Sequence, residues 1–355
     1  MPTFRTGPVV RVLEARPGLQ RVEVDLGRGP ERAYALTRLT GDVAVGDRVV
    51  VNTTAVELGL GTGGWHVVHW NLARDAWHEP GPGHVVKARY TSLQADVGST
   101  EEHHPELADV VAVDGLPVVV VGLHSQIAAV AVAAKEARPG ARVAYVMTHG
   151  AALPIVLSDL VHRLRADGLL DATITAGQAF GGEHEAVTVA SALAISRHVL
   201  AADVAIVGMG PGIVGTGTAL GTTGLEVATA LDTAVALGGR AVAALRASFA
   251  DPRPRHHGLS HHSRTALGIL VRERVVVPVP KVGGPDEAQL RADLAEAGIT
   301  ARHHVRDAAP VGIVEQFAAR GLEVSSMGRP AAADPVLFEA AAVAGVTAVC
   351  PGGEP

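Results

Sequence analysis

Most of the chain after Leu116 alternates short apolar runs with longer stretches of helical periodicity. Apolar runs of strand length that alternate with helices favour a parallel sheet with helices on both faces. We therefore expect a Rossmann-like α/β domain. Strands are predicted at residues 117–121, 142–147, 172–175, 202–207, 241–245, 275–279, 300–305 and 346–349. Helices are predicted at residues 127–137, 225–236, 285–296 and 311–319, with two more that end near residues 164 and 200, the second opening at residues 180–184.

The first 95 residues carry a different pattern, in which apolar and polar residues alternate with a period of two. Such segments lie at residues 9–13, 20–26, 32–36 and 47–52, with glycine-containing turns between them. Short alternating strands without a helical pattern predict a small antiparallel β-barrel. The expected division is a barrel domain at residues 1–95 and the α/β domain at residues 96–355.

Composition narrows the class of protein. The chain has 355 residues and a net charge of −6, and it contains no basic run, which argues against a nucleic-acid partner. Its single cysteine, Cys350, excludes a disulfide framework and fits a reducing compartment, so we expect a cytoplasmic protein. No apolar run is long enough to span a membrane, and no membrane association is expected. The shortage of lysine relative to arginine indicates a GC-rich bacterial genome.

A glycine-rich segment follows the predicted strand at residues 202–207 and marks the expected binding site. Glycines after a strand let bare backbone N–H groups approach an anion at the carboxyl edge of a parallel sheet. The ligand-binding candidates in this segment are Gly210, Gly212, Gly215, Thr216, Gly217 and Thr218. Residues 210–215 also match the dinucleotide fingerprint G-x-G-x-x-G. Later glycines delay the helix that this fingerprint requires, but Arg246 would suit a 2′-phosphate, so an NADP-dependent oxidoreductase stays open as an alternative.

Polar residues follow the other predicted strands and should meet at the same edge of the sheet. The candidates for catalysis are His124, His149 and Gln178. Further ligand-binding candidates are Ser125, Thr148, Gly150, Gly177, Arg246 and Ser248. Together they predict a small-molecule cleft in an enzyme or sensor for an anionic ligand, phosphorylated or nucleotide-like. No residue pattern specifies a cofactor.

A second group of polar residues, at positions 248–268, is rich in histidine and arginine. His257 and His261 are four residues apart, as two zinc ligands on one helix would be, and they are the candidate metal ligands. Prolines and glycine interrupt this spacing, and Ser260 instead resembles the N-cap of a helix. A loop that binds an anion and a metal-dependent hydrolase both remain open. A scaffold whose barrel binds RNA or a protein partner is the non-enzymatic alternative, and homo-oligomer formation is left open.

Six separate motifs give the chain a family resemblance. They read NTTAVELGLGTGG, GHVVKARYTSLQ, AYVMTHGAALP, DATITAGQAFGGEHEAV, ADVAIVGMGPGIVGTGTALG and SHHSRTALG. With these motifs the chain resembles the bacterial domain-of-unknown-function 3866 family (DUF3866) from about residue 46 to residue 268. The resemblance implies no particular activity, substrate or cofactor, so no catalytic residue is assigned through it.

Overall fold

The computed structural model describes residues 2–60 and 62–350. The chain divides into two compact units, Met1–Gly98 and Ser99–Pro355. Within the described residues, no helix combines the length and the apolar character needed to cross a membrane.

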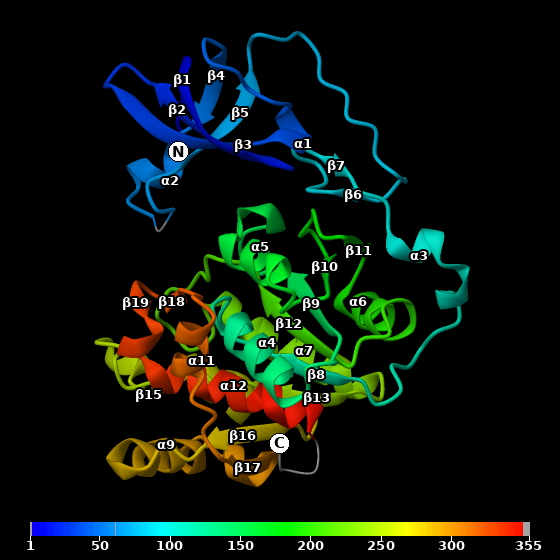
Figure 1. Ribbon diagram of the computed structural model, residues 1–355, viewed down its shortest axis with the longest axis vertical. Coiled ribbons are helices and arrows are strands. Elements are labelled where there is room, and N and C mark those ends of the chain that lie inside the picture. Colours follow the sequence, from blue (N-terminus) through cyan, green and yellow to red (C-terminus); the bar gives the residue numbers. More distant parts are fainter. Residues whose placement is uncertain (1, 61, 351–355) are drawn as a thin grey trace. The chain divides into compact units, whose positions relative to one another are not determined.

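The first unit is a closed five-stranded barrel in the order β1-β2-β3-β5-β4 (Figure 1). Its strands are β1 (Phe4–Arg16), β2 (Leu19–Asp25), β3 (Pro30–Leu36), β4 (Arg48–Asn52) and β5 (His66–Asn71). Four of the five pairings are antiparallel, but β3 and β5 run parallel. The expectation of a purely antiparallel barrel is therefore wrong, because strand directions cannot alternate all the way around a closed ring with an odd number of strands.

Alternation along the strands fills the barrel with apolar side chains. Val22 and Val24 on β2, Ala33 and Ala35 on β3, and Val49 on β4 are all fully buried. Their neighbours point outward and include charged residues that pair across strands, as expected for a half-buried strand. Two short helices, α1 (Thr37–Thr40) and α2 (Thr54–Glu57), connect barrel strands. After β5, the first unit continues with the short antiparallel pair β6 (Val86–Lys87) and β7 (Ala95–Asp96).

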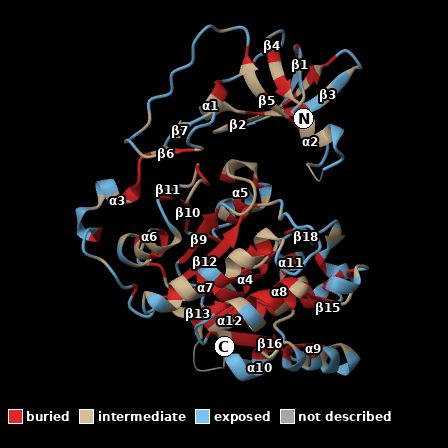
Figure 2. Cartoon of the chain, turned by 180° about the vertical axis from the view of Figure 1, so that it is seen from behind, coloured by how far each residue is buried: buried red, intermediate tan, exposed pale blue. Residues whose placement is uncertain are grey.

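The second unit contains an eight-stranded sheet in the order β11-β10-β9-β12-β8-β13-β16-β17. Every pairing in it is parallel, which confirms the predicted parallel sheet. The strands are β8 (Pro117–Val120), β9 (Val143–Thr148), β10 (Ala172–Ala176), β11 (His184–Ala186), β12 (Val204–Met209), β13 (Arg240–Ala243), β16 (Val276–Pro280) and β17 (His304–Ala308). The central strands β9 and β12 are buried throughout (Figure 2), which explains why they read as continuous apolar runs.

Helices cover both faces of this sheet, as the alternation predicts. One face packs on α4 (Gln126–Ala137), α5 (Asp159–Ala166), α11 (Ile313–Ala319) and most of α12 (Pro335–Val349). The other face packs on α6 (Val189–Ala194), α7 (Glu226–Ala236), α9 (Gly284–Glu296) and α10 (Ile299–Arg302), and on Ala266 and Leu267, which follow α8 (His261–Thr265). Alternate residues of one strand enter the two cores: Val119 faces the first, and Val118 and Val120 face the second.

Two predicted elements are replaced by others, and the strand predicted at residues 300–305 is shifted, because α10 continues to Arg302 and β17 begins only at His304. Residues 180–184 do not open a helix, because residues 184–186 form the edge strand β11 beside β10 and α6 starts only at Val189. The side chain of Glu185 accepts a hydrogen bond from Thr175 Oγ1 at 2.6 Å, which ties this polar strand to the sheet. Residues 346–349 belong to α12 rather than to a last strand. This helix is buried on nearly all sides, and a short apolar run inside such a helix resembles a buried strand.

Candidate functional site

The carboxyl edge of the sheet has a topological switch point, where the loops after neighbouring strands lead to opposite faces of the sheet. In the strand order β8 lies between β12 and β13. The chain leaves β8 through α4 on one face, and it leaves β12 and β13 through α7 and α8 on the other. Open α/β sheets bind ligands where the loops diverge in this way. The residues that follow β8, β12 and β13 are therefore the candidates for a ligand site.

Hydrogen bonds to Met209 and Ser158, and a longer contact of 3.4 Å with the hydroxyl of Tyr145, hold the ring of His124, which follows β8. Its Nδ1 lies 3.2 Å from the carbonyl oxygen of Met209, and its Nε2 lies 2.6 Å from Oγ of Ser158. Since a carbonyl only accepts, Nδ1 carries the proton and Nε2 accepts from the Ser158 hydroxyl. Burial lowers the pKa of His124 to about 4, so the ring is neutral at neutral pH. The buried Ser158 is also the N-cap of α5 and accepts from the amide of Val161 at 3.0 Å. His124 thus joins β8 to β12 and α5.

His149, which follows β9, packs against the backbone of Gly177 after β10. A β-carbon at Gly177 would lie 2.0 Å from Nδ1 of His149, and the φ of Gly177 is +68°. Nearby, Glu226 opens α7, and its Oε2 is buried without a hydrogen-bond partner among the described residues. Burial raises the pKa of Glu226, an effect that the charge of His149 partly offsets. The Thr148 hydroxyl and the backbone of Gly150 also lower this pKa.

The glycine-rich segment after β12 forms a loop that closes on itself. The amide of Thr216 donates to the carbonyl of Gly221 at 2.8 Å, and the amide of Gly221 donates to Oγ1 of Thr218 at 3.0 Å. The amide of Thr223 donates to the carbonyl of Val214 at 2.9 Å. Several of the donors expected to face a ligand therefore have partners within the loop. Contact between this loop and a ligand stays a prediction.

The loop also lacks the context of a dinucleotide fingerprint. In that motif the helix begins within the glycines. Here the loop continues past them, and α7 begins only at Glu226. Gly210 has a packing role, since a β-carbon there would lie 2.5 Å from the carbonyl oxygen of Ala152. The only support for the NADP alternative in the described residues is therefore the sequence match to the fingerprint, and this alternative stays a prediction.

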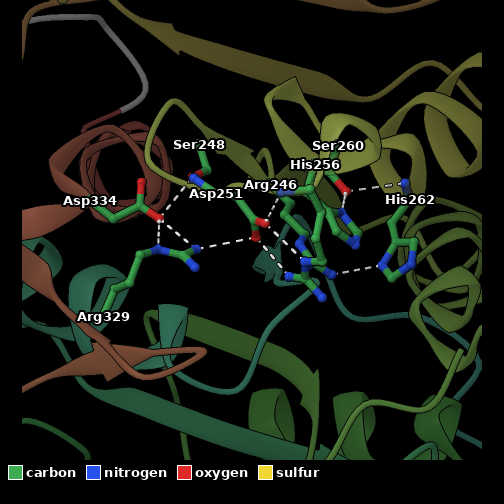
Figure 3. Close-up of polar contacts among 9 residues, drawn as sticks. Arg246, Ser248, Asp251, His256, Ser260, His262, Arg329 and Asp334 are labelled. Atoms are coloured by element: carbon green, nitrogen blue, oxygen red, sulfur yellow. Dashed lines mark hydrogen bonds and ion pairs between the residues drawn. The ribbon is translucent and has the colours of Figure 1, made fainter. Parts of the chain in front are cut away.

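Beyond β13, His256, His261 and His262 form a compact cluster with Arg246; Figure 3 shows His256, His262 and Arg246. His256, His261 and His262 have ring centroids 4.3–5.1 Å apart. Arg246 Nη1 lies 2.8 Å from Nδ1 of His262, and Nδ1 of His256 lies 2.8 Å from Oγ of Ser260. Ser260 is the N-cap of α8, as its sequence position predicts, and accepts from the amide of His262.

These three histidines are neutral at neutral pH. Burial, together with the charge of Arg246, lowers the pKa of His256 and of His262 to about 3. Burial and neighbouring arginines also lower the pKa of His261, whose Nε2 is buried without a hydrogen-bond partner among the described residues. Each ring therefore presents one nitrogen lone pair.

A network of ion pairs borders the cluster and gives Asp251 and Asp334 arginine partners. Asp251 binds Arg253 at 2.7 Å, and Arg329 lies between Asp334, at 3.0 Å, and Asp251, at 3.2 Å (Figure 3). The hydrogen bond from Arg253 holds the pKa of Asp251 well below its usual range. Ser248, a predicted ligand-binding residue, donates to Asp334 at 2.8 Å. Its hydroxyl therefore belongs to this network.

Two guanidinium groups at the cluster remain without a carboxylate. Arg246 is only 4% exposed and has no ion-pair partner among the described residues. Arg255 is exposed and likewise unpaired within the described part of the chain. A β-carbon at Gly217 would lie 3.7 Å from Nη1 of Arg255, and one at Gly224 would lie 2.9 Å from Nδ1 of His262. The glycine-rich loop therefore borders the cluster of positive charge.

The predicted residues fall into separate groups. His257 is exposed and its ring contacts Phe249 at 5.6 Å between centroids, so it lies outside the histidine cluster that contains His261. Gln178 is half-buried after Gly177, and Ser125 precedes α4 without a side-chain capping bond. A small pocket at the edge is lined by Thr148 and Glu226 but by none of the three predicted catalytic residues.

Sequence reasoning missed several residues that contribute to these groups. They are Tyr145, Ser158, Glu226, Arg329 and Asp334. Glu226 could have been found as the first acidic residue of the helix after the glycines. The others carry no local signal, because strand or helix positions bring them in from distant parts of the chain.

The fold and the site define an α/β protein with a Rossmann-like parallel sheet, an added barrel, and a polar carboxyl edge. The chain matches the family described as Protein of unknown function (DUF3866) over residues 32–345. It therefore belongs to this family, and the match extends beyond residues 46–268, where the shared motifs lie. No curated protein matches the chain.

Proposed function

We propose that the second unit binds an anionic small molecule, phosphorylated or nucleotide-like, beyond β13 between Arg246 and Arg255. One observation carries the proposal: Arg246 is a buried guanidinium that makes no direct ion pair with a carboxylate in the described part of the chain, and the charge of Asp251 offsets its burial only in part. Buried charges are costly unless they are paired. An anion in this position would supply the missing partner.

The chemistry of the surrounding groups supports a phosphate-like ligand. A guanidinium has five N–H donors, and Nη1 of Arg246 donates a hydrogen bond to the neutral ring of His262. The other donors suit the oxygens of a phosphate, which arginine binds in paired fashion. Arg255 adds a second positive charge beside Gly217, where the glycine-rich loop keeps side chains away. Such a site serves a sensor or an enzyme equally well.

The test measures thermal unfolding of the whole chain with inorganic phosphate, pyrophosphate or sulfate, and with adenosine as the control that lacks phosphate. A ligand at about 100 times its Kd stabilises the folded state by about 2.7 kcal/mol. That gain raises the unfolding midpoint by several degrees, on the order of 5–10 °C for a domain of this size. We expect the shift in the wild-type protein and its loss in Arg246→Met.

The matched control is Arg274→Met, which removes the same charge from an exposed position ahead of β16. This variant should respond to phosphate or pyrophosphate as the wild-type protein does. An equal response in Arg246→Met, or no response of the wild-type protein to any of the anions, would contradict the proposal.

A further inference from the structure

We infer that His256, His261 and His262 bind one divalent transition-metal ion of the zinc type. The inference goes beyond the anion site and does not depend on it. It stands on the geometry of the three rings. One potential ligand atom from each residue lies within 4.8 Å of the other two. In addition, Nε2 of His261 is buried and has no hydrogen-bond partner among the described residues.

The spacing of the rings agrees with a shared ion. With Zn–N bonds of about 2.0–2.1 Å, tetrahedral coordination places imidazole centroids about 5 Å apart. The observed separations are 4.9 Å for His256 and His261, 5.1 Å for His256 and His262, and 4.3 Å for His261 and His262. The interplanar angles of 48°, 87° and 58° show that the ring planes are inclined to one another and are not stacked. Rings that direct one nitrogen each toward a common point adopt this arrangement.

A hydrogen bond outside the ligand set orients His256. Its Nδ1 lies 2.8 Å from Oγ of Ser260. With the proton on Nδ1 and Ser260 as the acceptor, Nε2 presents its lone pair to the ion. Metal-binding histidines usually have such a partner on the other nitrogen, which fixes the tautomer. Ser260 is itself held in place as the N-cap of α8.

Arg246 and the ion compete for His262. Arginine only donates, so Nδ1 of His262 presents a lone pair to Nη1 of Arg246. An ion at Nδ1 would take that lone pair. An ion at Nε2 would require the proton on Nδ1, which could then no longer accept. Coordination through either nitrogen therefore releases Arg246, and removing this arginine should strengthen metal binding.

The donor set favours zinc-type ions over Mg²⁺ or Ca²⁺. Imidazole nitrogens suit zinc, copper, nickel and iron, whereas Mg²⁺ and Ca²⁺ prefer oxygen ligands. The carboxylate of Asp251 in the bordering network is held by Arg253 and Arg329. Three protein ligands leave the fourth position of the ion open to water or to an oxygen of a ligand.

The experiment titrates metal into the full-length protein after chelator treatment, in a buffer without phosphate or sulfate. Zn²⁺ binding is followed by calorimetry, and Co²⁺ binding by the visible absorption of the bound ion. We expect one ion per chain in the wild-type protein and loss of this binding in His261→Gln. His257→Gln is the matched control, because that exposed histidine belongs to the same segment but lies outside the cluster. It should bind metal as the wild-type protein does.

Two further variants keep the inference testable. His262→Gln should lose Zn²⁺ binding in the same way. Two variants are used so that a folding defect in one of them does not decide the result. The unfolding midpoint of each variant in the presence of chelator shows whether it folds. Arg246→Met should bind Zn²⁺ more tightly than the wild-type protein. Absence of uptake, or equal uptake in His261→Gln and His257→Gln, would overturn the inference. Because no anion is present, these results stand apart from the test of the anion site.

Discussion

Arg246→Met should stabilise the protein in the absence of anions while it removes the proposed anion site. Burial and neighbouring arginines, Arg253 foremost, lower the pKa of Arg246 from 12.5 to about 10. This change corresponds to about 3 kcal/mol against the charged form in the folded state. The guanidinium is charged at neutral pH in both the folded and the unfolded protein, so the folded protein carries this cost in full. Methionine removes the charge but keeps an apolar chain of similar length in the core.

The gain is partly offset by the lost hydrogen bond to His262. A hydrogen bond from a charged donor contributes about 1.5 kcal/mol or more, which leaves a net stabilisation of about 1–2 kcal/mol. The assay is urea unfolding in a buffer without phosphate or sulfate. Far-UV circular dichroism follows the second unit, because the three tryptophans, at residues 65, 70 and 77, all lie in the barrel unit. A variant that is less stable than the wild-type protein, and still stabilised by pyrophosphate, would refute the reasoning.

Three further predictions follow from named contacts. The pKa of His124 is lowered in the folded state, so the unfolded chain binds the proton first and stability falls as the pH drops from about 6.5 toward 4; at pH 5 the loss attributable to this group is up to about 2 kcal/mol, and urea unfolding of His124→Gln should show that much less dependence on pH. Gly215→Val should weaken pyrophosphate binding in calorimetry with little change in the unfolding midpoint, because the loop is exposed there; normal binding would make the loop a packing element. Gly224→Ala should weaken Zn²⁺ binding, since its β-carbon would lie 2.9 Å from His262 Nδ1, and unchanged calorimetric affinity would contradict that placement.

The sheet could be predicted from the sequence because its strands are buried on both faces. Val204 to Met209 are all buried in β12, and they read as one apolar run that ends at the glycines. The edge strand β11 could not be predicted in the same way. Its residues His184 and Glu185 are polar, and they form a strand only because β10 offers hydrogen bonds beside them. Tertiary pairing here decides between strand and helix.

The sequence predicts where the candidate site lies, but only part of the residue groups that the structure brings together there. Arg246 and the histidines near Ser260 stand out because polar residues gather after a strand of the sheet. The choice of His257 over His256 followed helical spacing, but His256 lies in the short 3₁₀ turn Pro254–His256 ahead of α8. The partners of Asp251 show a second limit. Arg329 is 78 residues away along the chain, and only the packing of the segment ahead of α12 brings it to the network.

The two proposals meet at Arg246, and this shared residue gives them a thermodynamic consequence. While Arg246 donates to His262, the lone pair of His262 is not available to a metal ion, and one N–H donor of Arg246 is not available to an anion. An ion on His262 releases the guanidinium, which can then turn all its donors to the anion, and the anion in turn offsets the positive charge that repels the ion. We therefore expect each ligand to raise the affinity for the other by the same factor. Calorimetry can test this with sulfate, which binds zinc weakly in water, by titrating sulfate with and without Zn²⁺ and Zn²⁺ with and without sulfate. An unchanged or decreased affinity for either ligand in the presence of the other would show that Arg246 does not link the two sites.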